Sequence, residues 1–312
     1  MRVFVLAAVG LALALVPAAH AGSFSPWSGA VNAESLPGTS ELLNTEFNDG
    51  CPIQSPAGLA LYMASNRKRF VGDPRTDLDI WVSRRASTDD PWGAPENLEA
   101  VNSTADDFCP TPVRGGGLFF VSRKVTEGVT CGPTTGTPTG DIYFTRRNPT
   151  HGWATPRHLG CGPDGPNSAL DEQGPSYVEA GDPSLYFSSG PDIFVSREKA
   201  DGSFGPAAPV AELNSAANDI QPNVRKDGRE VVFSSNRPGG KGLQDIWGAS
   251  RDSVDDPWSA PVNLGDAINT ADRSESRPSF SWDGETLYFG RAPAGQPGDI
   301  FVATRNRTRG GK

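Results

Sequence analysis

A short apolar phrase beginning with Asp-Ile occurs five times, at intervals of roughly 50 to 60 residues, so one structural unit is used repeatedly. The phrases occupy residues 79–83, 141–145, 192–196, 245–249 and 299–303. A second strand-like run precedes each phrase, at residues 59–63, 117–121, 184–188, 230–234 and 286–290. A proline that opens a further short strand lies upstream, at positions 52, 110, 175, 222 and 278. The repeated order predicts the same set of strands in every unit.

A fourth strand follows the Asp-Ile phrase in four of the units. It begins with an aromatic residue and continues with a proline and an apolar residue, at residues 92–98, 153–159, 204–210 and 258–264. Four short antiparallel strands are the content of one propeller blade. We expect the recurring aromatic residues to be core anchors, because they return at one position of every unit. The high content of glycine (36) and proline (28) fits short strands joined by tight turns.

The fifth unit ends at Thr304 without its aromatic strand, and an unpaired copy of that strand (WSGAVNAESL) stands at residues 27–36. An N-terminal strand that completes the last blade would close the ring and remove its open edges. The sequence therefore predicts an all-β fold, a five-bladed β-propeller closed by its N-terminal strand. We expect one domain over residues 22–304, followed by a basic tail over 305–312.

The first 21 residues have the features of a secretory signal peptide: Arg2, an apolar run over 3–16, and Ala19-His20-Ala21. No later segment reaches the ~20 apolar residues that a membrane span requires. Without Arg2 the chain carries 27 basic and 37 acidic residues, a net charge of −10, which argues against a nucleic-acid partner. We expect a monomeric protein that is periplasmic or secreted, without a membrane span or a cofactor.

The sequence resembles the WD40-like (PD40) repeats of the TolB-type propellers. The resemblance lies in Ser-Ser-Asn-Arg at 234–237 followed by Asp-Ile-Trp at 245–247, in Lys-Asp-Gly at 226–228 and Trp-Asp-Gly at 282–284, and in the proline-led first strand. It implies a propeller fold but does not identify a function, since such repeats serve scaffolds, peptidase gates and binding modules. The chain departs from these relatives because it has no room for a TolB-like N-terminal α/β domain and no appended peptidase.

An acid stands three residues before each leading proline, so every blade has one at a mouth of the central channel. These acids are Asp49, Asp107, Glu172, Asp219 and Glu275. They could form a funnel for a cationic ligand, or the two carboxylates of a glycosidase, which lie ~5 to 9.5 Å apart. Because catalysis requires two acids that differ while all five repeat, we favour hydrogen bonding to the backbone of the ring. Ligand contact stays the alternative.

Arginine follows the second strand in four of the blades, at Arg67, Arg123, Arg237 and Arg291, and is missing from the third blade. We expect these arginines to pair with the aspartates that open the third strands, Asp79, Asp141, Asp245 and Asp299. The alternative is an anionic ligand held by the planar guanidinium fork. Arg67, Arg123 and Arg237 therefore join the five acids as candidate ligand-binding residues.

The repeat is least regular between the second and third strands of blades 1 and 2, where a loop over 66–78 and a longer loop that contains residues 130–140 form an asymmetric wall. This wall lies on the face that carries the acids and is the predicted binding surface. Asp73, Asp77 and Asp79 in the first loop lack the pattern of a calcium-binding loop, so we expect a solvated turn and no metal site. His151 and His158 have no catalytic partner at a recognisable spacing, and we expect both to face solvent.

Four cysteines in an exported chain favour two disulfides. Cys51 and Cys109 occupy equivalent positions in adjacent blades, while Cys131 and Cys161 lie in loops around blade 2. We therefore predict the bridges Cys51–Cys109 and Cys131–Cys161. Peptide mapping without reduction would test this pairing.

These observations favour an exported, non-catalytic propeller that binds a protein or glycan of the cell envelope on the acidic loop face of blades 1 and 2. No motif of a triad hydrolase, a zinc peptidase or a phosphate-binding loop is present. The alternative is a secreted glycoside hydrolase or lyase that uses carboxylates at the channel mouth.

Overall fold

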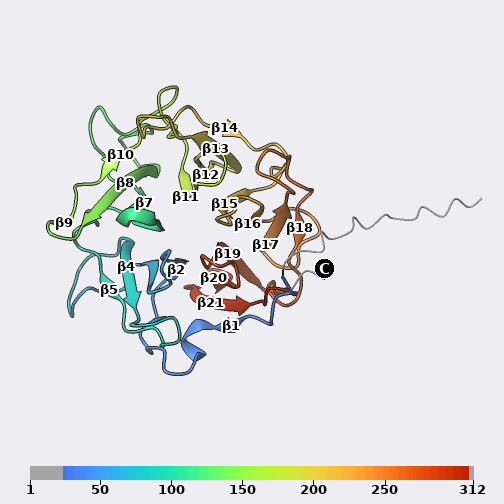
Figure 1. Ribbon diagram of the computed structural model, residues 1–312. Helices are drawn as coiled ribbons and strands as arrows, with labels where there is room; N and C mark the ends of the chain where they lie inside the picture. The colour runs from blue at the N-terminus through green and yellow to red at the C-terminus, as the bar shows by residue number, and fades with distance from the viewer. Residues whose placement is uncertain (1–23, 309–312) are drawn as a thin grey trace, which may run out of the picture.

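The computed structural model describes residues 24–308. The predicted signal peptide and residues 309–312 of the predicted tail lie outside this range. Within it, short strands form five antiparallel sheets arranged as blades around a central axis (Figure 1). No helix among the described residues is long and apolar enough to cross a membrane. The predicted all-β five-bladed propeller is confirmed.

The strands of each blade are named below in order from the central channel outward. Blade 1 contains β2 (Asp49–Gln54), β3 (Ala60–Ser65), β4 (Asp79–Arg84) and β5 (Glu96–Asn97). Blade 2 contains β6 (Asp107–Val113), β7 (Gly117–Ser122), β8 (Asp141–Asn148) and β10 (Arg157–His158), with β9 (Gly152–Trp153) also paired to β8. Blade 3 contains β11 (Glu172–Val178), β12 (Ser184–Ser189), β13 (Asp192–Arg197) and β14 (Ala208–Pro209). Blade 4 contains β15 (Asp219–Val224), β16 (Glu230–Ser235), β17 (Asp245–Ser250) and β18 (Val262–Asn263). Blade 5 contains β19 (Arg273–Phe280), β20 (Thr286–Pro293), β21 (Asp299–Thr304) and β1 (Val31–Asn32).

The N-terminal strand closes the ring as predicted. In Figure 1 the blue β1 lies outside the red β21, and the two pair with Val31 opposite Val302 and Asn32 opposite Phe301. Arg305, placed by the sequence in the basic tail, is only 8% exposed and makes an ion pair of 2.7 Å with Glu230 of blade 4. The C-terminal end of β21 is thereby fixed to the neighbouring blade.

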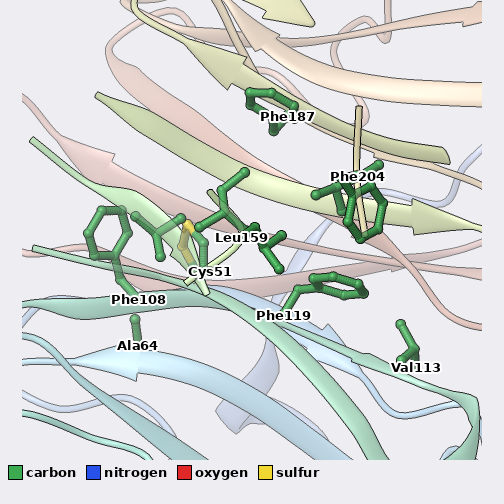
Figure 2. Close-up of a cluster of buried hydrophobic side chains, with 12 residues drawn as sticks. Cys51, Ala64, Phe108, Val113, Phe119, Leu159, Phe187 and Phe204 are labelled. Carbon is green, nitrogen blue, oxygen red and sulfur yellow. A yellow bond between two sulfur atoms is a disulfide. The ribbon is translucent and has the colours of Figure 1, made fainter. Parts of the chain in front are cut away.

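The core lies between the blades. The middle of each second strand supplies one fully buried large side chain, which is Met63, Phe120, Phe187, Phe233 or Phe289. Figure 2 shows the cluster that joins blades 2 and 3, where Phe108, Phe119, Phe187 and Phe204 surround Leu159. Burial of each such side chain stabilises the folded state by ~1.5–3 kcal/mol. The recurring aromatic residues also act as core anchors, since Trp92 and Trp258 are buried. The outer strands that follow them are only two residues long, as in β5 and β18, and nearby prolines favour such short strands.

A bulge interrupts the inner strand of every blade two residues after its acid. The backbone there has positive φ, between 47° and 56°, at Cys51, Cys109, Gly174, Gln221 and Arg277. The inner strands therefore bend toward the axis and line a channel cavity of only about 30 Å³. We call the end of this channel at which the inner strands begin the channel mouth. A sugar ring does not fit into a channel cavity of this size.

Candidate functional site

The five predicted acids open the inner strands and are buried, with at most 1% of each residue exposed. Asp49 accepts hydrogen bonds from the backbone amide and hydroxyl of Thr45, at 2.6 and 2.8 Å. Asp219 accepts the same two bonds from Ser215, at 2.6 and 2.7 Å. Each acid thus holds the turn that leads into its own strand. The contacts of these side chains are those of a repeated structural element.

Three arginines neutralise three of these acids. Arg67 pairs with Asp49, Arg237 with Asp219 at 2.5 Å, and Arg291 with Glu275 at 2.8 Å. The expectation that they pair with the third-strand aspartates is wrong, because these arginines reach the inner acids. Asparagines bind two of the third-strand aspartates: Asn97 donates to Asp79 at 2.9 Å and Asn263 to Asp245 at 2.7 Å.

Blade 2 differs because its arginine follows the second strand at a different spacing. Arg67 lies two residues after Ser65, the partner of Asp49, whereas Arg123 directly follows Ser122, the partner of Asp107. Successive side chains of an extended chain point in opposite directions, so this offset turns Arg123 away from Asp107. Its guanidinium lies at the channel mouth, 3.0 Å from Asp106 and 3.0 Å from Asp171.

The buried acids of blades 2 and 3, Asp107 and Glu172, have no arginine partner. Asp107 Oδ1 and Glu172 Oε2 are buried and have no hydrogen-bond partner among the described residues. Burial raises the pKa of Asp107 to about 6 and the pKa of Glu172 to about 7, although hydrogen bonds from serines oppose both shifts. Burial also raises the pKa of Glu275, but there Arg291 opposes the shift.

The acids that reach solvent at the channel mouth are Asp106 and Asp171, whose side chains are 31% and 29% exposed. Asp106 accepts a hydrogen bond from the amide of Leu78 in blade 1, at 2.9 Å. Asp171 accepts bonds from the amide of Gly140 and from Gln173 Nε2, both at 2.7 Å. We call Asp106, Arg123, Asp171 and Gln173 the mouth cluster.

Blade 1 shows that this position does not need a charge. There Asn48 Oδ1 accepts the amide of Gly298 from the preceding blade, at 3.1 Å, in the way that Asp106 accepts Leu78. The amide oxygen of asparagine meets the structural requirement, so the carboxylates of Asp106 and Asp171 add negative charge that the fold does not need. Gly140 permits the close approach of Asp171, because a Cβ there would lie 3.2 Å from Asp171 Oδ1 and 3.0 Å from the carbonyl oxygen of Glu172. Neither residue was predicted from the sequence, although the contrast between Asp106-Asp107 and Asn48-Asp49 was a visible signal.

Arg277 projects into the channel from the bulge of blade 5 and lines the small channel cavity. Its guanidinium lies against Gly50 of blade 1, where an added Cβ would be 3.1 Å from Nη1. Burial and the charge of Arg123 lower the pKa of Arg277, and Asp171 opposes this shift. The channel mouth thus combines two carboxylates with two guanidinium groups.

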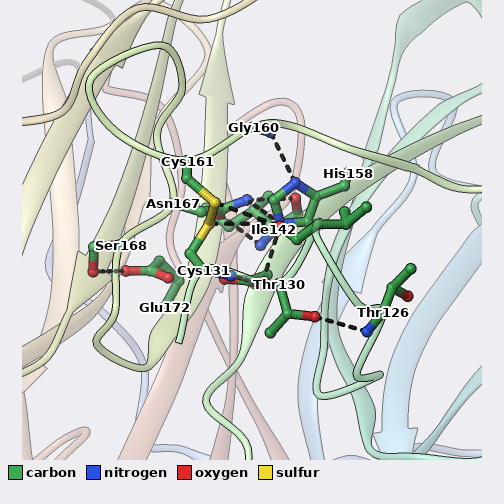
Figure 3. The surroundings of a disulfide bond; sticks show 12 residues. Thr126, Thr130, Cys131, Ile142, His158, Gly160, Cys161, Asn167, Ser168 and Glu172 are labelled. Carbon is green, nitrogen blue, oxygen red and sulfur yellow. Dashed lines mark hydrogen bonds and ion pairs between the residues drawn. A yellow bond between two sulfur atoms is a disulfide. The ribbon is translucent and has the colours of Figure 1, made fainter. Parts of the chain in front are cut away.

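Both predicted disulfides are present, Cys51–Cys109 between blades 1 and 2 and Cys131–Cys161 beside the second long loop (Figure 3). Such bonds belong to an oxidising compartment, either extracellular or periplasmic. The expectation that His158 faces solvent is wrong: its side chain is 8% exposed and lies 3.1 Å from Asp141 and 3.8 Å from Cys131 Sγ.

Cys131, His158 and Cys161 lie close enough to hold a metal ion. The two sulfur atoms are bonded to each other, however, and the amide of Gly160 donates to His158 Nδ1 at 3.0 Å. His158 Nε2 lies 3.1 Å from both Asp141 Oδ2 and Asn167 Nδ2, so both ring nitrogens already have partners within the protein. These three residues brace the loop.

The long loop of blade 1 is closed by ion pairs. Arg69 pairs with Asp73, and Arg75 pairs with both Asp77 and Asp79. The Arg69 guanidinium holds the pKa of Asp73 well below its usual range. Asp73, Asp77 and Asp79, the three carboxylates of this loop, thus each have a cationic partner.

A cavity of about 800 Å³ lies between blades 5 and 1 at the end opposite the channel mouth. Its Trp92 is buried and covered by Arg85, whose guanidinium carbon is 4.2 Å from the ring centre. A smaller cavity of about 430 Å³ between blades 3 and 4 has the same architecture, with Arg251 over Trp258 at 4.2 Å. Because the arrangement repeats, we attribute the groove to the blade architecture.

No protein-family model and no curated protein sequence matches the chain. Among solved structures it is similar to the GH43 protein BlXynB from Bacillus licheniformis (TM-score 0.53, 15% identity, 88% of this chain and 57% of that one). It is also similar to a thermostable family-43 glycoside hydrolase (TM-score 0.53, 15% identity, 88% and 94%). A third neighbour is a xylan β-1,4-xylosidase from Bacillus halodurans (TM-score 0.51, 13% identity, 87% and 56%). The chain spans a little over half the length of the first and third of these proteins. At such identities the similarity shows the fold.

These neighbours correct the first functional expectation. The three solved propellers described above are glycoside hydrolases, and they contradict the expectation of a non-catalytic binding or scaffold protein of the TolB type. The alternative stated beside it, a glycoside hydrolase, is the better supported of the two. The resemblance to TolB-type repeats extends only to the five-bladed fold.

Proposed function

We propose that the chain is an exported glycoside hydrolase that cleaves a glycan lying across the channel mouth, with Asp106 and Asp171 as its two carboxylates. The observation that carries the proposal is the placement of two partly exposed acids around one guanidinium. Because the two Arg123 amino groups share one carbon, the acids cannot be farther apart than the ~9.5 Å limit for paired glycosidase carboxylates. Family-43 glycoside hydrolases with the same fold support the reaction class.

The surroundings assign the two roles. Asp171 accepts hydrogen bonds from Gly140, Gln173 and Arg123, and such donors suit the carboxylate that must carry negative charge. It either removes a proton from the attacking water or attacks the anomeric carbon itself. Asp106 accepts fewer bonds, from Leu78 and Arg123, and donates a proton to the glycosidic oxygen as the C–O bond breaks.

The predicted acids have a different place in this proposal. Asp49, Asp107, Glu172, Asp219 and Glu275 are buried and shape the inner strands on which the mouth cluster stands. Arg67 and Arg237 neutralise two of them. Arg123 is the one predicted candidate that we place in the site, where it positions both carboxylates.

The proposal is tested by screening the mature chain against polysaccharides and measuring the release of reducing ends. We expect hydrolysis of at least one substrate and a loss of ~100-fold or more in Asp106→Asn and Asp171→Asn. Both variants should fold, because asparagine already fills the equivalent position in blade 1. Asp182→Asn is the matched control, since Asp182 is 79% exposed in a surface pair with Arg197. Full activity in both mouth variants would contradict the proposal, as would an inactive wild-type protein.

A further inference from the structure

Arg277 is the one charged residue at the bulge position of the five inner strands. The corresponding residues are Cys51 and Cys109, which form a disulfide, Gly174, and Gln221. A fold that needed a charge at this position would repeat it, as it repeats the buried acids. The arginine is therefore an addition to blade 5.

The guanidinium of Arg277 has no acceptor. Among the described residues its side chain makes no hydrogen bond and no ion pair within 4.0 Å, whereas Arg67, Arg237 and Arg291 all pair with acids. Its nearby charged groups include Arg123, which repels it, and Asp171, which already accepts bonds from Gly140, Gln173 and Arg123. A partly buried cation without an acceptor is costly unless an anion meets it.

The position of Arg277 points to where that anion lies. The guanidinium lines the channel cavity below the mouth cluster, and the cavity of about 30 Å³ holds only a small group and no sugar ring. Gln173 and Gln221, which are joined by a hydrogen bond of 2.7 Å, connect the carboxylate side of the mouth to the same cavity. A substituent that projects from a sugar at the mouth would reach the guanidinium.

We infer that the channel mouth recognises an acidic sugar, with the carboxylate of a uronic acid or a sulfate ester bound by the Arg277 guanidinium. The planar fork of arginine can donate two parallel hydrogen bonds to the oxygens of either group. This inference rests on the proposed function, since it names the substrate class of the same site. Neutral sugars would leave the guanidinium unpaired and bind less tightly.

Calorimetry with the mature chain tests the inference by binding alone. The probes are D-galacturonate, neutral D-galactose of the same stereochemistry, and inorganic sulfate. We expect galacturonate or sulfate to bind at least tenfold more tightly than galactose, and Arg277→Gln to abolish that preference. Arg273→Gln is the matched control, because Arg273 lies on the same strand and is 42% exposed beside Asp272. If the affinity for galacturonate depends on Arg277, the natural ligand carries a uronate. If only the affinity for sulfate depends on Arg277, the natural ligand carries a sulfate ester.

Arg277→Lys keeps the charge and supplies a second variant if the glutamine variant does not fold. We expect it to retain part of the preference for the anionic probe. Equal affinity for galacturonate, sulfate and galactose in the wild-type protein would overturn the inference, as would an anion preference that survives in Arg277→Gln. Because binding is measured without turnover, loss of the inference leaves hydrolysis by Asp106 and Asp171 standing. Loss of hydrolysis likewise leaves the anion site standing.

Discussion

Blades 1, 4 and 5 pair their buried inner acid with an arginine, and blades 2 and 3 do not. In the first group Arg67, Arg237 and Arg291 reach the acids of their own blades. In the second group Arg123 lies at the channel mouth, and blade 3 has no arginine after its second strand. The two groups share their strand order and bury the acid equally well, so the difference lies in one side chain.

This difference teaches how a repeated fold can acquire a site. A buried carboxyl group can be neutralised by a cation or by a proton, and the raised pKa values of Asp107 and Glu172 favour the proton at mildly acidic pH. In blade 2 the arginine is shifted by one residue, which leaves Asp107 without a cation and places the Arg123 guanidinium between Asp106 and Asp171. The same change thus weakens a structural pair and builds the mouth cluster.

The largest effect is expected for Arg67→Met in blade 1. It leaves Asp49 buried without its cation, which costs ~3–5 kcal/mol of unfolding free energy. Urea denaturation at pH 7 measures the loss, and Asp49→Asn combined with Arg67→Met should recover part of it. A loss below ~1 kcal/mol would show that the pairing does not distinguish the blades.

A pH-dependent effect is expected for Glu172→Gln in blade 3. Its folded-state pKa of about 7 lies above the ordinary 4.5, so the folded protein binds a proton that the unfolded chain has lost. The stabilisation by this group is complete below pH 4.5 and is lost as the pH rises toward 7. Relative to the wild type, the variant should therefore gain up to ~3 kcal/mol between pH 4.5 and 8. A stability difference that does not change over this range would contradict the unpaired state of Glu172.

Inserting an asparagine between Ser122 and Arg123 should convert blade 2 to the spacing of blade 1. We expect the guanidinium to turn toward Asp107, which would stabilise the protein by ~1.5–3 kcal/mol at pH 8. The same insertion should abolish hydrolysis, because the mouth cluster loses its arginine. Thermal unfolding and a reducing-end assay measure both effects, and retained activity with unchanged stability would refute the role of the spacing.

The smallest change in stability is expected for Arg123→Met. Its ion pairs are partly exposed, and such pairs contribute about 1 kcal/mol or less. Hydrolysis should nevertheless fall at least ~10-fold, because Arg123 holds both carboxylates in position. Comparing this variant with Arg67→Met in the same urea series separates the two kinds of arginine. Equal losses of stability would erase the distinction.

Much of the fold could be predicted from the sequence because the same strand pattern occurs five times. The Asp-Ile phrases fixed the third strands, and the orphan copy at 27–36 identified the strand that closes the ring. Equivalent positions in adjacent blades also paired Cys51 with Cys109. Such inferences need only the order and spacing of residues.

The site depends on features that spacing alone does not determine. The direction of Arg123 follows from a one-residue difference at a strand end, and that of Arg277 from a bulge with φ of 56°. The environment of His158 depends on a disulfide and on Asp141, which is distant in sequence. The expected arginine partners were wrong because the sequence did not show that the arginines reach the inner acids, nor that asparagines bind Asp79 and Asp245.

The most direct measurement compares hydrolysis by Asp171→Asn with hydrolysis by Glu172→Gln. These neighbours differ in exposure, since the Asp171 side chain is 29% exposed at the mouth and Glu172 is fully buried beneath it. We expect Asp171→Asn to lose ~100-fold or more in rate and Glu172→Gln to stay within a few-fold of the wild type at pH 7. An active Asp171→Asn together with an inactive, folded Glu172→Gln would contradict it.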